Sequence, residues 1–130
     1  MIKNAKFILK EARLRVSYMT TKDCLFCKLI KGEIKTDKVL ETGEVVAVND
    51  INPVSDVHIL IIPKKHIDSV LTIKRDDSSD IIKMFEVAKK LAENMKLSAF
   101  RLAFNGGKYQ HVPHLHMHLL AGRKVEWNHL

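Results

Sequence analysis

The amino-acid sequence predicts a single α+β domain with about five mainly antiparallel strands, one short helix and one long helix. The chain has 130 residues, which is the size of one domain. Segments rich in β-branched residues alternate with turn residues, and one long segment has the periodicity of an amphipathic helix. Apolar residues make up 46% of the chain and charged residues 28%, which is sufficient for a packed core. The expected strands are residues 39–41, 44–49, 57–62, 100–105 and 114–121.

The two expected helices differ in length and in their end signals. The short helix covers residues 24–30, begins after the capping residue Asp23 and ends before Gly32. The long helix covers residues 76–96 and has Asp77 and Ser78 as candidate N-caps. Its apolar side chains recur at the spacing of a helix that packs on a sheet: Ile81, Met84, Phe85, Ala88, Leu91 and Met95. Together with the strands they predict a layered arrangement.

Charge is distributed unevenly along the chain. There are 22 Lys and Arg residues against 15 Asp and Glu residues, a net charge of +7. Residues 1–18 hold five basic residues against Glu11 alone, which is a local charge of +4. We interpret residues 1–18 as a basic N-terminal extension, with Met19 as an alternative start, and residues 19–130 as the domain. The remaining residues carry only +3, which favours anionic small molecules as readily as nucleic acid. The charge therefore does not by itself indicate a nucleic-acid partner, and we do not expect one.

The cysteines and the hydropathy pattern bear on the compartment. Cys24 and Cys27 are too close in sequence to form the disulfide framework of a small secreted domain, and no signal peptide is recognised. No apolar run approaches the roughly 20 residues that a transmembrane helix needs. We therefore expect a cytoplasmic protein without a membrane segment. By itself the Cys-x-x-Cys pair fits half a zinc site that histidines could complete, a redox pair, or chance neighbours.

Four of the seven histidines occur between positions 111 and 118. His114, His116 and His118 alternate with apolar residues, so a strand would place the three imidazoles on one face and the apolar side chains on the core. Such a row is costly unless each ring finds a partner, which makes a purely structural role a weak explanation. A metal site, an acid–base relay, or a nucleophile directed at phosphorus could each use it. No Walker-type loop or GxGxxG motif offers another phosphate cradle.

The segment His-Leu-His-Met-His-Leu-Leu at 114–120 matches the signature of the histidine triad (HIT) family. The resemblance covers about residues 23–127 and is to the histidine triad nucleotide-binding (Hint) branch. Further matching stretches are residues 24–34, 49–53, 58–66 and 122–127, the last ending at Trp127. The resemblance implies a HIT fold, a homodimer and no organic cofactor.

The resemblance also implies site residues. His116 would carry a covalent nucleotidyl group, His118 would hold phosphate oxygens, and His58 would assist proton transfer to the leaving group. The nucleotide-binding set would be Asp50 at the ribose, Val48 and Ile51 at the base, Asn105 near the phosphate, and Gln110 and His111 before the triad. Zinc-bearing relatives imply a structural zinc site made by Cys24, Cys27, His66 and His114.

Two departures from the branch pattern concern the leaving-group side. His111 stands where the branch has serine, and the loop at residues 105–110 is shorter, with Pro113 directly before the triad. The predicted function is hydrolysis of purine nucleoside 5′-phosphoramidates or related AMP conjugates. The alternatives are hydrolysis of dinucleoside polyphosphates and a non-catalytic AMP-binding sensor or scaffold. Repair of adenylated nucleic-acid ends is less favoured, since residues 1–18 have few aromatic side chains for stacking.

Overall fold

The computed structural model describes residues 23–125 and 130. Its five strands form one sheet in the order β1-β2-β3-β5-β4, and every neighbouring pair is antiparallel. The strands are β1 (Lys38–Glu41), β2 (Val45–Asn49), β3 (Val57–Pro63), β4 (Arg101–Ala103) and β5 (Met117–Ala121). The helices are α2 (Leu25–Ile30), α3 (Ser78–Asn94) and the short 3-10 turns η2 (Val70–Thr72), η3 (Arg75–Asp77) and η4 (Gly107–Tyr109). The predicted α+β class is confirmed. The basic extension 1–18, Met19 and Trp127 lie outside the described residues.

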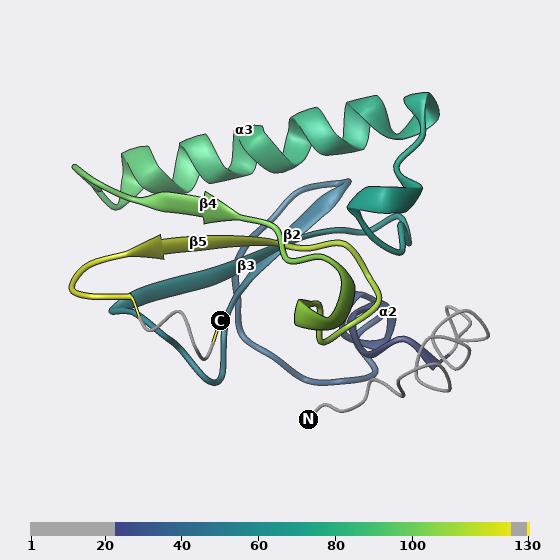
Figure 1. The fold of residues 1–130 in the computed structure, drawn as a ribbon, viewed down its shortest axis with the longest axis horizontal. Helices are drawn as coiled ribbons and strands as arrows, with labels where there is room; N and C mark the ends of the chain where they lie inside the picture. Colours follow the sequence, from purple (N-terminus) through teal and green to yellow (C-terminus); the bar gives the residue numbers. More distant parts are fainter. Residues whose placement is uncertain (1–22, 126–129) are drawn as a thin grey trace.

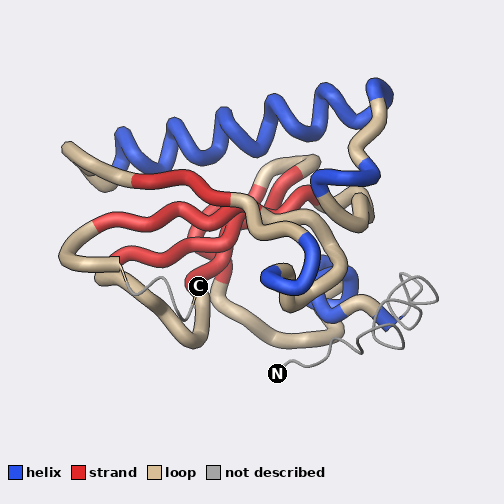
Figure 2. The backbone as a smooth tube through the Cα atoms, in the orientation of Figure 1, coloured by secondary structure: helices blue, strands red, loops and turns tan. Residues whose placement is uncertain are grey.

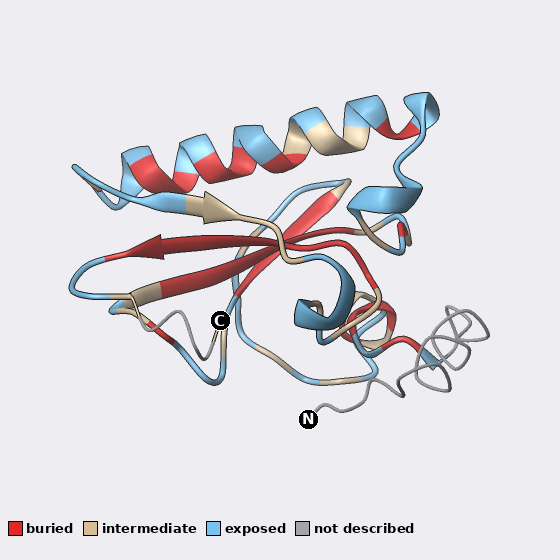
Figure 3. Ribbon diagram, in the orientation of Figure 1, coloured by how far each residue is buried: buried red, intermediate tan, exposed pale blue. Residues whose placement is uncertain are grey.

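Two hydrophobic cores lie on opposite faces of the sheet. Figure 1 shows α3 along one side of the sheet and α2 on the other. In β2, Val45 and Ala47 pack in the core with α3, whereas Val46 and Val48 pack in the core with α2. This alternation follows from the two-residue period of a strand and requires apolar side chains on both faces. Figure 3 shows the consequence, since β3 and β5 are buried along almost their whole length.

The pairing of β3 with β5 determines where the histidines lie on the sheet. Figure 2 shows the loop that follows β4, with its short helical turn, beyond one end of the sheet. β3 and β5 pair in the middle of the sheet, with Leu60 opposite His118 and His58 opposite Leu120. This register brings histidines from strands 60 residues apart in sequence onto one face.

The long helix differs from its predicted bounds and in part of its apolar stripe. It runs from Ser78 to Asn94, and the preceding residue Asp77 makes no side-chain cap bond to the helix. Met84, Ala88 and Leu91 are buried against the sheet, as the periodicity predicts. Phe85 and Met95, however, are 47% and 41% exposed, because both lie at the edge of the stripe beyond the sheet. The short helix also differs at its start, since its N-cap is Cys24 rather than Asp23.

The strand predicted over 114–121 begins only at Met117. Continued pairing would set Leu115 opposite Pro63, which has no N–H to give to a ladder. The N–H of Leu115 instead donates to the carbonyl of Ile67. Strand β4 is likewise shorter than the predicted 100–105. His114, at the end of a bend, and His116 therefore both precede β5, with Leu115 still in the core.

In the part of the chain that the structure describes, no helix is long and apolar enough to cross a membrane.

Candidate functional site

His58 and His118 form the centre of one polar cluster on the α2 side of the sheet. His58 Nε2 lies 2.9 Å from His118 Nδ1 and 3.3 Å from the Asp50 carboxylate. The backbone N–H of Val54 donates to His58 Nδ1 over 3.1 Å. Asp50 follows β2 and is anchored by the N–H of Asn52, so the loop after β2 closes over the histidines.

These contacts fix where the protons lie. Because Nδ1 of His58 accepts a hydrogen bond from Val54, neutral His58 carries its proton on Nε2 and donates it to Nδ1 of His118. His118 then carries its own proton on Nε2. The side-chain nitrogen Nδ2 of Asn105, itself a donor, lies 3.4 Å from that atom, so in this tautomer the two groups do not hydrogen-bond to each other and both can donate to a bound group. The relay therefore presents an N–H donor at the surface of the cluster.

His116 is oriented by the main chain. Its Nδ1–H donates to the carbonyl of His114 over 2.7 Å, which leaves a lone pair on Nε2. The edge of Phe26 packs on the ring, with ring centroids 5.0 Å apart. Burial lowers the pKa of His116 below its ordinary value, and burial also lowers that of His118 to about 3. Both imidazoles are therefore neutral at pH 7, the form in which a ring nitrogen acts as a nucleophile.

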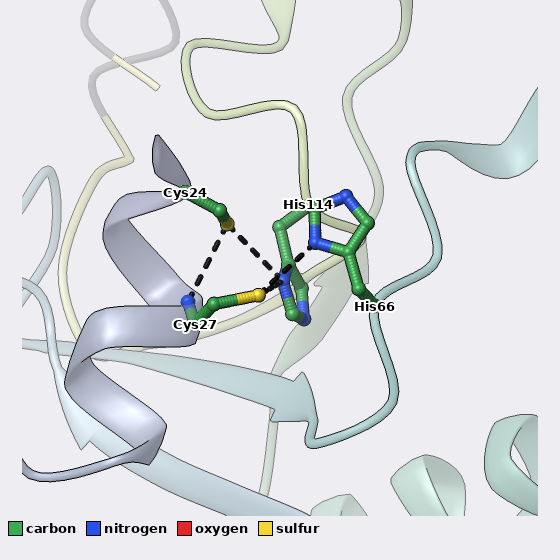
Figure 4. Close-up of side chains that lie close together, drawn as sticks. All are labelled: Cys24, Cys27, His66 and His114. Atoms are coloured by element: carbon green, nitrogen blue, oxygen red, sulfur yellow. Dashed lines mark hydrogen bonds between the residues drawn. The ribbon is translucent and has the colours of Figure 1, made fainter. Parts of the chain in front are cut away.

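A second cluster is built from α2 and two segments at the end of β3 (Figure 4). The Nδ1 of His114 lies 3.4 Å from Cys24 Sγ and 3.5 Å from Cys27 Sγ, and the Nδ1 of His66 lies 3.1 Å from Cys27 Sγ. All four donor atoms lie within 4.8 Å of one another. Three of the four residues are buried and His66 is half-buried.

The outer contacts orient both imidazoles of this cluster. His114 Nε2–H donates to the carbonyl of Pro63 and His66 Nε2–H to the carboxylate of Asp68, each over 2.8 Å. Each Nδ1 is consequently a free lone pair aimed at the sulfurs. Burial and the hydrogen bond from Cys24 raise the pKa of the Cys27 thiol to about 12. Without a cation the Cys27 thiol stays protonated, so the donor set is one that a metal ion would stabilise.

The remaining predicted nucleotide-binding residues lie in different surroundings. Val48 is buried beneath the first cluster, whereas Ile51 is 89% exposed. His111 is exposed, and its electrostatic interaction adds a smaller lowering to the pKa of His116 and of His118, which burial mainly causes. The side-chain amide of Gln110 donates to the carbonyls of Asp68 and Val112, so it braces the loop rather than facing the relay.

Sequence reasoning missed several groups that orient these side chains. The backbone N–H of Val54 and the carbonyl of Pro63 leave no trace in residue identity, because every residue has a carbonyl and nearly every one an N–H. Phe26, which packs on the His116 ring, was not predicted as a site residue, although it lies in the matching stretch 24–34. Asp68 could have been found, since a carboxylate two positions after a candidate ligand histidine is a common outer partner.

Comparison with known proteins places these clusters in context. A family model described as "Scavenger mRNA decapping enzyme C-term binding" matches residues 23–128. The chain is 38% identical over 107 residues to the adenosine 5′-monophosphoramidase of Candida albicans, a match that covers 75% of the chain and 68% of that protein. It is 40% identical over 102 residues to the adenosine 5′-monophosphoramidase of Saccharomyces cerevisiae, covering 77% of the chain and 63% of that protein.

The fold also matches solved structures. The structure of a histidine triad protein from Clostridium difficile superposes with a TM-score of 0.76 at 41% identity, covering 82% of this chain and 96% of that one. The matched region thus spans about two thirds of the two monophosphoramidases, but nearly all of this bacterial protein.

Proposed function

Because the chain belongs to the histidine triad family, we propose that it hydrolyses the phosphorus–nitrogen bond of purine nucleoside 5′-phosphoramidates. The observation that carries this proposal is the pair formed by His116 and His118. His116 offers a lone pair on Nε2, and His118 offers a hydrogen-bond donor on Nε2. The proposed reaction needs these two functions side by side, one to attack phosphorus and one to bind the phosphoryl oxygens.

In the proposed first step, Nε2 of His116 attacks the α-phosphorus of a substrate protonated on its bridging nitrogen. The phosphorus–nitrogen bond breaks, its electron pair stays on nitrogen, and the amine leaves uncharged. The His116 ring becomes cationic, and its Nδ1–H still donates to the carbonyl of His114, which stabilises that charge. Water then attacks the phosphorus, the nucleotide departs, and the lone pair returns to Nε2 as one proton passes to solvent.

The other members of the cluster would support these steps. His118 donates from Nε2 to a phosphoryl oxygen, while His58 holds His118 in that tautomer and, as the resemblance implies, assists proton transfer toward the leaving group. Asp50 would accept hydrogen bonds from the ribose hydroxyls, and Val48 and Ile51 would contact the purine. Asn105, near His118 Nε2, would bind the phosphate.

The test is hydrolysis of adenosine 5′-phosphoramidate by the parent protein and by His116→Ala, with intact-mass detection of a nucleotidyl adduct. We expect turnover by the parent with a transient adduct, and a loss of at least about a thousandfold in the variant, since the covalent route is removed. Activity retained in His116→Ala, or no turnover by a parent that binds AMP, would contradict the proposal.

We also propose that the second cluster binds one zinc ion with a structural role. Two sulfurs and two imidazole nitrogens are the preferred tetrahedral zinc ligands, and both imidazoles have their outer nitrogens occupied as metal-ligating histidines do. A bound ion would hold the segment before His116 against α2. Elemental analysis is expected to give one zinc per chain, reduced by Cys27→Ser. Cys24 and Cys27 are both free thiols, which suits a reducing compartment, and we propose the cytoplasm.

We further propose that the protein is a homodimer that pairs through β4 and α3. β4 is an edge strand of the sheet, and unprotected edges pair readily with another chain. Beside it lies a 480 Å³ groove lined by Phe85, Phe100, Leu102 and their neighbours on α3. Phe85 and Phe100 are half exposed on this side. A second copy would bury these aromatic side chains, which is the arrangement expected of an isologous interface.

A further inference from the structure

A hollow of 320 Å³ adjoins the cluster of His58 and His118 at Asn105. It is lined by Ser69, Val70 and Leu71 from η2 and its cap, and by Phe104, Asn105, Gly106 and Gly107 from the shortened loop after β4. Asn105 belongs to both places, since its side-chain amide lies 3.4 Å from His118 Nε2. The hollow therefore begins one residue away from the atom proposed to hold the phosphoryl oxygens.

The lining has no charged side chain, and most of its surface is apolar, with Ser69 and Asn105 as its polar side chains. Val70 and Leu71 are 46% and 86% exposed, an unusual position for two neighbouring aliphatic side chains. Gly106 and Gly107 have no neighbouring atom within 4 Å of the place where a Cβ would lie, so the loop leaves open space. By contrast, the groove beside α3 includes charged residues such as Lys89 and Glu93. An uncharged lining disfavours a second nucleotide or a polyphosphate and favours an apolar group.

The backbone that carries the exposed side chains is ordered by local hydrogen bonds. Ser69 Oγ accepts from the N–H of Leu71, and Thr72 Oγ1 accepts from the N–H of Ser69, each over 3.1 Å. This reciprocal cap orders η2 although none of its residues is buried. A preformed wall costs a ligand little ordering entropy, which is typical of a specificity site.

We infer that this hollow, the η2 subsite, binds an apolar side chain on the leaving amine of the substrate. The inference rests on the proposed function and deepens it, because it assigns the leaving-group class. The amine departs from phosphorus into the space beyond Asn105, and its aliphatic or aromatic substituent packs on Leu71, Val70 and Phe104. The expected substrates are nucleoside 5′-phosphoramidates of primary amines with several carbon atoms, in preference to those of ammonia.

The test uses adenosine 5′-phosphoramidates of ethylamine, butylamine and hexylamine. These amines have nearly equal basicity, so the intrinsic reactivity of the phosphorus–nitrogen bond is matched across the series. We expect kcat/KM of the parent to rise by roughly threefold for each methylene that enters the subsite. Leu71→Ser should flatten that rise, so that kcat/KM of the variant differs by less than about twofold across the three amines. Ile82→Ser, which replaces a comparably exposed aliphatic residue on α3, is the matched control and should preserve the rise.

The outcomes separate the two proposals. Equal kcat/KM for the three amines would overturn the η2 subsite while the proposed function stands, and so would equal effects of Leu71→Ser and Ile82→Ser. If no substrate is turned over, the proposed function fails, and calorimetry with non-hydrolysable adenosine 5′-sulfamates decides the subsite. Tighter binding of an N-hexanoyl than an N-acetyl sulfamate, lost in Leu71→Ser, would support it, whereas equal dissociation constants would overturn it.

Discussion

Replacing His118 with glutamine is expected to make the protein markedly less sensitive to acid. The His118 side chain is buried, and that burial lowers its pKa from the ordinary value of 6.5 to about 3. In the unfolded chain the imidazole takes up a proton once the pH falls below about 6.5, while in the folded protein it stays neutral until about pH 3. The unfolded state therefore binds more protons between these values, and stability falls as the pH falls.

The magnitude follows from the distance between the two pKa values. Each pH unit in that window costs about 1.4 kcal/mol. At pH 5, about 1.5 units below the unfolded value, His118 alone removes roughly 2 kcal/mol of unfolding free energy relative to pH 8. Glutamine has no proton to take up, so its variant lacks this contribution.

The assay is urea unfolding at pH 8 and pH 5, followed by circular dichroism at one fixed protein concentration, since the proposed dimerisation would make stability depend on concentration. The quantity of interest is the loss of unfolding free energy between the two pH values, compared between parent and variant. Any metal loss at pH 5 is common to both and cancels. Asn105→Ala, which removes a neighbour of His118 without removing a titrating group, is expected to keep the parent's pH dependence. Equal losses for the parent and His118→Gln would refute the reasoning.

Three further predictions concern the metal site, a tight turn and the dimer. Asp68→Asn removes the carboxylate that accepts from His66, and we expect zinc affinity to fall about 10- to 100-fold in competition with a chelator. Unchanged affinity would show that Asp68 does not support His66 as a zinc ligand. Gly122→Ala would put a Cβ 2.5 Å from Cβ of Asp56, which precedes β3 where Gly122 follows β5, at a φ of +105°, and should cost about 2–4 kcal/mol in urea unfolding. Gly43→Ala, with nothing within 4 Å, should cost less than about 1 kcal/mol, and equal costs would argue against the contact. Phe85→Glu places a charge on the proposed interface and should yield monomers by light scattering, and persistence of the dimer would exclude this face.

The elements with strong periodicity were predictable because their signals are local. β2 and β3 are runs of β-branched residues buried on both faces, and α3 has a stripe that repeats with the helical period. The limits of β5 were not predictable in this way. Whether pairing continues before Met117 depends on which residue lies opposite, and that residue is Pro63, 54 positions earlier in the chain. A single-sequence pattern contains no information on that partner.

The cap of α2 gives a similar lesson. Asp23 has the better capping side chain by propensity, yet Cys24 takes the position and its sulfur accepts from the N–H of Cys27. The Cys24 thiol also contacts Nδ1 of His114 over 3.4 Å, so tertiary contacts outweigh local preference. The exposed Phe85 has the same origin, because helical spacing gives the direction of a side chain but not the width of the sheet beneath it.

The sequence by itself determined which chemistry the chain carries. The alternation of His114, His116 and His118 with apolar residues places the three imidazoles on one face of the segment and the apolar side chains on the other, and the motif assigns the family. Only the tertiary structure decided what each imidazole does. It separates the row into His114, which faces the thiols, His116, which donates to a main-chain carbonyl, and His118, which accepts from His58. The physical reason is that a histidine's role depends on which ring nitrogen holds the proton, and that choice is made by hydrogen-bond partners contributed by distant segments, several of them backbone atoms that no residue identity reveals.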